Sequence, residues 1–281
     1  MKLILPLFLL LLSRPCFSQE LFVSTEPASS LPAKSIDLKI SGRYFPFDRV
    51  YDRPAARLTA ELKAGLTKKW MVSLGRSFSD MHTYRFKYES YFFYTKYRFL
   101  SHDDVHRHFR MAAFLQASHT DSPFHYDEVG LTGDKSGIEA GLIATRLSNR
   151  FALSASVSHA QLLDASRFNK TVYVPRHIYE VMNYSLSSGY LLFPKNYSGY
   201  RQLGINLYME LLAQQALDGS KYFAEAAPAL QLVFFSTTRL NAGYRFQLAG
   251  NAQRMSKNSW VIGIEQSFLN VWKRRKGGVS N

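Results

Sequence analysis

The chain alternates most strictly near its C-terminus, in RLNAGYRFQLAG at residues 239–250 and KNSWVIGIEQSF at residues 257–268. The apolar positions are Leu240, Ala242, Tyr244, Phe246 and Leu248 in the first segment and Trp260, Ile262, Ile264 and Phe268 in the second. Small or polar residues fill most of the positions between them. A strict period of two is typical of a β-strand whose two faces meet different surroundings. The two segments therefore predict a hairpin, which would suit a soluble sandwich as well as a barrel.

Residues 1–18 have the features of a secretory signal peptide. Lys2 is followed by a short apolar segment, ILPLFLLLL, and Cys16 and Ser18 occupy the −3 and −1 positions of a cleavage site. The apolar segment is too short for a transmembrane helix. We expect an exported protein cleaved near Ser18-Gln19. Cleavage would remove the only cysteine, so the mature chain could form no disulfide and no thiolate site.

The chain is basic, with a formal net charge of +14, to which the signal contributes Lys2 and Arg14. In a cytosolic protein this excess would favour a nucleic-acid partner, but an exported chain does not routinely meet nucleic acid. Anionic lipid headgroups, lipopolysaccharide phosphates and anionic solutes remain as partners. After the signal, no apolar run approaches the roughly 18 residues that a membrane helix needs. A chain that spans a membrane without such helices must form a closed barrel.

The same alternation recurs about twelve times along the chain. The expected strands cover residues 35–45, 58–66, 70–78, 88–99, 109–116, 136–147, 151–158, 179–193, 203–211, 222–236, 239–248 and 257–268. Pro228 predicts a bulge or a later start in the tenth strand, because proline cannot donate to the ladder.

The connections between these strands are sorted by length. Those after the odd-numbered strands are longer, above all 119–134 and 162–178, and those after the second, sixth and tenth are short. The connections 100–107 and 194–199 are exceptions. Long loops at one rim, with short turns and both termini at the other, are the layout of an outer-membrane barrel. We therefore predict an all-β fold, an antiparallel transmembrane up-and-down β-barrel of about twelve strands, with ten or fourteen as alternatives.

Aromatic residues cluster near the ends of the expected strands, as they do in interfacial girdles. They are Tyr44, Trp70, Phe78, Tyr88, Phe99, Phe109, Phe151, Tyr190, Phe193, Tyr222 and Trp260. The charges expected on the lipid face, Arg76, Lys96 and Arg146, also lie near strand ends. A charge there costs roughly 0–1 kcal/mol, against roughly 2–4 kcal/mol at mid-bilayer. The strand at 88–99 is aromatic on both faces, so its orientation has the weakest support.

The expected organisation has four parts. Residues 1–18 form the signal, 19–34 an extended N-terminal leader, 35–272 the barrel and 273–281 a basic periplasmic tail. The leader is either a disordered tail or a segment that folds back toward the lumen. The tail is expected to be solvated, with binding of a partner as the alternative.

The complete pattern resembles a largely uncharacterised group of small, porin-like outer-membrane barrel proteins of Gram-negative bacteria. The resemblance rests on the signal, the proline-containing leader, the alternating strands and the closing W-x-x-G-x-x-x-x-F strand with Trp260, Gly263 and Phe268. It implies residence in the outer membrane. Barrels of this kind often end on the terminal aromatic residue, whereas this chain continues beyond Phe268. The closing aromatic residue is therefore either Phe268 or Trp272.

Charged residues on the inward positions are the candidate pore lining. They are Asp37, Lys39, Arg43, Glu61, Lys63, Arg110, Glu139, Glu210, Arg245 and Glu265. Most lie on the first two and last two strands, which become neighbours when a barrel closes. They could form an eyelet that selects solutes by charge. They could equally be structural ion pairs that satisfy one another in a narrow lumen.

Enzymatic and metal sites are less favoured. Ser156, Ser158 and His159 resemble part of an acyl-hydrolase set. However, His159 is an odd number of residues from both serines, so it lies on the opposite face of the strand.

Basic residues in the expected long loops are candidates for contacts with lipopolysaccharide phosphates, or are simply solvated. They are Arg49, Arg53, Arg85, Lys87, Arg167, Lys170 and Arg176.

Metal binding has one weak candidate. The segment from His102 to His108 carries ligand-type residues but has no fixed geometry. We therefore predict no catalytic residues, no metal and no cofactor.

The function favoured by the sequence is that of a monomeric, passive outer-membrane channel for small polar or anionic solutes. The alternative is a non-conducting structural or assembly component of the outer membrane. An outer-membrane acyl hydrolase and a soluble secreted sandwich are less favoured. The sequence does not identify the solute, a protein partner, or whether the lumen is open.

Overall fold

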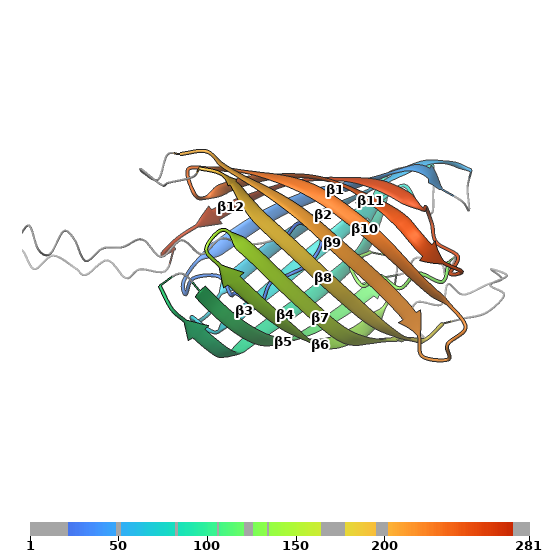
Figure 1. Cartoon of the computed structure of the whole chain (residues 1–281). Helices are drawn as coiled ribbons and strands as arrows, with labels where there is room; N and C mark the ends of the chain where they lie inside the picture. The colour runs from blue at the N-terminus through green and yellow to red at the C-terminus, as the bar shows by residue number, and fades with distance from the viewer. Residues whose placement is uncertain are drawn as a thin grey trace, which may run out of the picture.

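The computed structural model describes residues 22–48, 52–81, 84–105, 107–120, 126–133, 135–163, 178–194 and 202–271. Within these ranges, twelve strands form one closed barrel in which consecutive strands pair and β1 pairs with β12 (Figure 1). The strands are β1 (Ile36–Asp48), β2 (Arg53–Gly65), β3 (Trp70–Ser79), β4 (Lys87–Asp103), β5 (Arg107–Thr120), β6 (Gly137–Ser148), β7 (Phe151–Leu162), β8 (Glu180–Phe193), β9 (Gly204–Ala216), β10 (Tyr222–Phe234), β11 (Thr238–Gly250) and β12 (Asn258–Phe268). The predicted antiparallel up-and-down barrel of twelve strands is confirmed.

Closure joins the first strand to the last along an antiparallel register. Ile36 lies opposite Phe268 at one end of the pair, and Tyr44 lies opposite Trp260 at the other. The strands cross the barrel at a marked tilt, as a closed sheet requires (Figure 1). Because closure pairs the outer edges of β1 and β12, the sheet keeps no open edge.

The outer wall is apolar. Leu74 exposes 61% of its surface and Ile262 exposes 68%. In a sandwich such side chains would pack against a second sheet, but here the single sheet closes on itself and they have no protein partner layer. The soluble sandwich therefore does not fit. No helix in the described residues is long and apolar enough to cross a bilayer.

Exposed aromatic residues mark both ends of this apolar wall. Tyr44 and Trp260 face outward toward the rim of the longer loops, and Phe151 pairs with Tyr190 near the rim of the chain termini. Arg76 and Arg146 are exposed on the outer face, as expected.

The expected outward position of Lys96 is wrong. Its side chain is buried inside the barrel, whereas Tyr97 and Phe99 are exposed. The physical reason is a bulge near the start of β4, where the register with β3 shifts and Glu89 and Ser90 are both buried. The alternation is reversed from this point on, so Lys96 points into the lumen.

Two further details differ from the sequence expectation. β10 does not begin after Pro228, and its register with β11 shifts between Ala224 and Glu225, which is earlier than the proline. On the rim of the termini, the connection between β4 and β5 spans only 104–106, and the longest connection is 194–203.

The described part of the chain continues for three residues beyond the last strand and ends at Val271. β12 ends at Phe268, and the N–H of Val271 donates to the carbonyl of Lys34 at 2.9 Å. Trp272, the basic tail and the signal lie outside the described residues.

Residues 22–31 lie inside the barrel, and residues 32–35 lie at its rim, where Pro32 and Lys34 are exposed. Ala28 and Leu31 are buried against side chains of the inner wall. Of the two alternatives for the leader, its described part therefore folds back into the lumen.

Candidate functional site

The inner wall encloses a polar chamber of about 430 Å³. Hydroxyl and amide groups of Ser156, Ser185 and Asn183 line one side of it, and the rings of Tyr94 and Phe114 lie on another. These two rings stack with their centroids 5.5 Å apart. The leader bounds the chamber toward the termini, and two inward loops bound it toward the opposite rim.

The leader is the floor of the chamber. The N–H groups of Val23 and Ser24 both donate to Oε1 of Glu210 on β9, each at 2.9 Å. Farther along, the N–H of Ala28 donates to Oγ1 of Thr145 on β6 at 2.9 Å. The leader therefore crosses the lumen from wall to wall. This path also gives its backbone donors the partners that a buried segment requires.

Side chains add contacts at both ends of this floor. Phe22 packs edge-on against Tyr208, with ring centroids 5.7 Å apart. At the other end, Arg110 donates to Oγ of Ser29 at 3.0 Å while also pairing with Asp103.

One acidic residue of the leader binds two lysines of the barrel. Oε1 of Glu26 accepts a hydrogen bond from Lys63 on β2, and Oε2 lies 3.3 Å from Nζ of Lys96 on β4. Burial disfavours the charged carboxylate, but the positive charges of Lys63, Lys96 and Lys39 outweigh this effect. They hold the pKa of Glu26 well below its ordinary value. Glu26 is therefore ionised at neutral pH and anchors the floor.

An ion-pair network continues from Lys63 around the base of the lumen. Nζ of Lys63 lies 4.0 Å from carboxylate oxygens of both Glu61 and Glu265. Arg239 then pairs with Glu265 at 3.2 Å and with Asp37 at 3.6 Å. The candidates Asp37, Glu61, Lys63 and Glu265 thus belong to one ion-pair network on β12, β1 and β2. Its member on β11 is Arg239 rather than the candidate Arg245, which pairs with Glu225.

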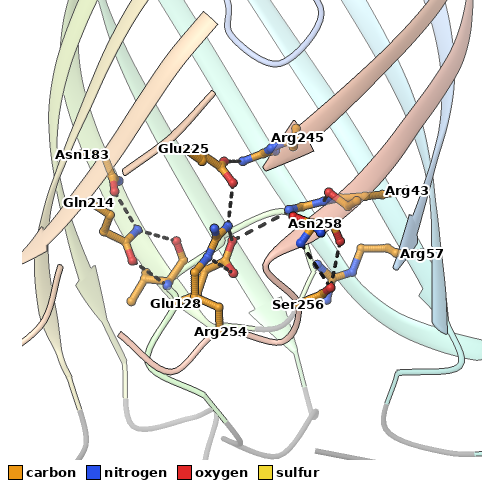
Figure 2. Close-up of polar contacts among 12 residues, drawn as sticks. Arg43, Arg57, Glu128, Asn183, Gln214, Glu225, Arg245, Arg254, Ser256 and Asn258 are labelled. Atoms are coloured by element: carbon orange, nitrogen blue, oxygen red, sulfur yellow. Dashed lines mark hydrogen bonds and ion pairs between the residues drawn. The ribbon is translucent and has the colours of Figure 1, made fainter. Parts of the chain in front are cut away.

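Two loops form the roof. Residues 126–133, after β5, turn inward, and Val129 exchanges two hydrogen bonds of 2.8 Å with the side chain of Gln214 (Figure 2). The loop between β11 and β12 meets them, because Asp127 and Gln253 are joined by two hydrogen bonds of 2.8 Å.

Arg254 holds the roof to the wall. Its guanidinium donates to both oxygens of Glu128 at 3.0 Å and to Glu225 on β10 at 2.7 Å (Figure 2). Glu225 also accepts a hydrogen bond from Arg245. Burial opposes ionisation of Glu128, but Arg254 and then Arg43 outweigh it and lower the pKa of Glu128 to about 2.

The ten candidate pore residues fall at different heights. Lys39, Arg43, Glu61, Glu139 and Arg245 line the chamber. Asp37, Lys63 and Glu265 belong to the network at the base, while Glu210 and Arg110 bind the leader. The structure thus brings most of them into two networks and does not gather them into one ring.

Several charged partners escaped the sequence reasoning. Glu26, Glu128 and Arg254 lie in the leader and loops, where no periodicity assigns a direction to a side chain. Arg239 is the first residue of the expected eleventh strand and has the same parity as Asn241 and Arg245, so the alternation alone would have placed it inward. Lys96 was given the wrong face because the bulge at Glu89 and Ser90, which reverses the alternation, carries no proline or glycine to mark it.

The hydrolase and metal candidates are not assembled. Ser158 hydrogen-bonds to Glu139 inside the barrel, and Ser156 bonds to Ser185. His159 instead lies 3.9 Å from Glu180. The carboxylate of Asp103, a metal candidate, is hydrogen-bonded to His108 and Arg110. In the part of the chain that is described, no group of three or more His, Cys, Asp or Glu residues is placed to hold a metal ion.

The barrel is similar to solved outer-membrane proteins. An outer membrane channel from Pseudomonas putida F1 matches with a TM-score of 0.57 and 12% identity, over 88% of this chain and 100% of that chain. The NanC porin matches with a TM-score of 0.49 and 10% identity, over 82% and 98% of the two chains. The KdgM porin gives 0.43 and 10%, over 83% and 99%. No family model and no curated protein matches the sequence. The predicted resemblance to porin-like outer-membrane barrels is confirmed at the level of the fold.

Proposed function

We propose that this protein is an outer-membrane channel for the passive passage of small polar or anionic solutes. The observation that carries the proposal is the polar chamber of about 430 Å³ inside a barrel whose outer wall is apolar. An apolar exterior suits lipid, and a polar interior suits hydrated solutes. Because the described strands form a single closed sheet, the apolar outer band has no second sheet to pack against, which also favours lipid.

The electrostatic preference belongs to the chamber wall. Lys39 and Arg43 on β1 face the space between floor and roof. Glu61 and Glu139 add acidic groups to the same wall, and both hydrogen-bond to neighbouring serines. The acidic groups are thus partly occupied by the protein. Arg43 is also bound, to Ser259 at 2.9 Å and to Glu128 at 4.0 Å, so the preference for an anionic or neutral polar solute rests mainly on Lys39.

Current through a planar bilayer tests this function. Refolded mature protein is expected to insert and give discrete conductance steps. In a salt gradient, the reversal potential should favour anions. A heat-modifiable, inserted protein without any current, at every voltage and pH tried, would reject the channel. Failure to insert would reject the membrane location itself.

The second candidate, a non-conducting structural or assembly component, is favoured by the leader that crosses the lumen. Such a protein would work through its loops and its C-terminal tail. Pull-down with the full chain and with a 1–272 truncation tests it. Partners that are captured only by the full chain would favour this candidate, and identical partner sets would count against the tail.

A further inference from the structure

We propose that Lys63 and Lys96, together with Lys39, form a carboxylate-binding site for the transported solute, and that Glu26 of the leader occupies this site as a built-in competitor. A solute carboxylate that replaces Glu26 would release the floor and open the channel. This inference rests on the proposed channel function and names its solute class and its regulation.

The site belongs to the barrel wall. Lys39, Lys63 and Lys96 come from β1, β2 and β4, while the carboxylate comes from the leader. Each oxygen of Glu26 faces a different lysine, Oε1 toward Lys63 and Oε2 toward Lys96. This arrangement fits a planar group with two oxygens, as any carboxylate has. Burying two lysine ammonium groups is costly unless an anion compensates them.

Solutes in the chamber can reach this site. Glu26 and Lys39 both line the chamber. The side chain of Glu26 remains 31% exposed, although Lys63 and Lys96 are almost fully buried. The carboxylate is therefore the accessible face of the site, where an incoming anion would compete.

The leader is held in a way that permits release. It contains no strand within residues 22–35. Apart from the lysine contacts, residues 23–29 are held by separate contacts to Glu210, Thr145, Ser187 and Arg110, while residues 30–35 stay bound to Lys69 and Gly65 at the rim. Lys96 also donates to the carbonyl of Pro27 at 2.6 Å, so the ion pair and the adjacent backbone share one anchor. If Lys96 no longer holds Glu26 and Pro27, the floor loses two contacts at once near its centre.

A binding measurement tests the competitor. Succinate is the probe, and its uncharged diamide, succinamide, is the matched control. Glu26→Gln in the refolded mature protein should bind succinate at least tenfold more tightly than the wild type, because the internal carboxylate is gone. Succinamide should bind both proteins equally. Equal succinate affinity for the two proteins would overturn the assignment of the site.

A disulfide tether tests the release of the floor. Oγ1 of Thr25 and Oγ of Ser187 lie 2.9 Å apart, and the only native cysteine is Cys16 in the signal. In the mature Thr25→Cys/Ser187→Cys protein, oxidation should abolish the succinate-dependent rise in open probability. Dithiothreitol should restore it in the same preparation. A verified disulfide that leaves the succinate response intact would overturn the inference.

These outcomes separate the inference from the function on which it rests. Channels that conduct but ignore succinate, with or without the tether, would leave the channel standing and overturn the release of the floor. An inserted protein that stays silent in the wild-type, Glu26→Gln and reduced double-cysteine forms would reject the channel. Tight succinate binding by Glu26→Gln in that silent barrel would still assign the carboxylate site.

Discussion

At the scale of single residues, the lumen is organised by arginine and lysine side chains that each serve more than one carboxylate. Arg254 binds Glu128 from its own roof and Glu225 from the wall, and it also lies over the ring of Phe223, 4.0 Å from the centroid. Removing one partner of such a buried pair leaves the other charge uncompensated, which costs about 3–5 kcal/mol. The roof therefore depends on Arg254 more than on any single contact of its backbone.

The roof should loosen in acid through Glu128. Its pKa is about 2 when docked, against 4.5 when free, so ionisation stabilises docking fully above pH 4.5. The stabilisation is lost as the pH falls toward 2. Wild-type conductance should rise over this range, and Glu128→Gln should already be high at pH 7 and show less of the rise. Arg254, Arg43, Arg245 and Glu225 also face Glu128, so an identical rise in both proteins would assign the effect to another group.

At the scale of elements, the last hairpin explains why the alternation is so strict. β11 and β12 pair from Thr238–Gln266 to Phe246–Asn258, so each residue keeps its face along the whole ladder. A slip of one residue would turn Ile262 inward and Glu265 outward. The slip is unfavourable on both faces, because the charge of Glu265 would face lipid and its ion pairs with Lys63 and Arg239 would be lost.

Depth in the bilayer should decide the cost of an outward charge. Ile262→Arg, at the middle of β12, should destabilise the folded barrel by roughly 2–4 kcal/mol. Leu248→Arg, near the end of β11, should cost only about 0–1 kcal/mol. Urea titrations of folding into lipid vesicles measure both values. Equal costs for the two variants would contradict the predicted position of the membrane.

At the scale of the whole molecule, the barrel is a wall with two internal closures rather than an open tube. The leader crosses the lumen near the termini, and the inward loops, whose polar contacts Figure 2 shows, bind the wall toward the other rim. A barrel of twelve strands lies between eight-stranded barrels filled by side chains and open porins of sixteen strands. Its conductance therefore depends on segments that are not part of the wall.

The charge of the chamber wall should set ion selectivity. Lys39→Glu with Arg43→Glu should shift the reversal potential toward cations, because both side chains line the chamber. Lys68→Glu with Lys69→Glu is the matched control, since these exposed lysines lie in the turn between β2 and β3. A shift of equal size in the control would indicate a general effect of surface charge.

The sequence by itself determined the barrel. Period-two alternation assigns a face to the strand residues, except beyond a bulge such as the one before Lys96, and connection lengths assign the rims, because both are local properties of the chain. Thus Asp37, Lys63 and Glu265, with their opposite charges, were predicted to lie together across β1, β2 and β12. The tertiary structure alone decided what fills the lumen. Glu26, Glu128 and Arg254 have no periodicity to orient them, so only the closed wall, with its buried charges to neutralise, fixes their positions.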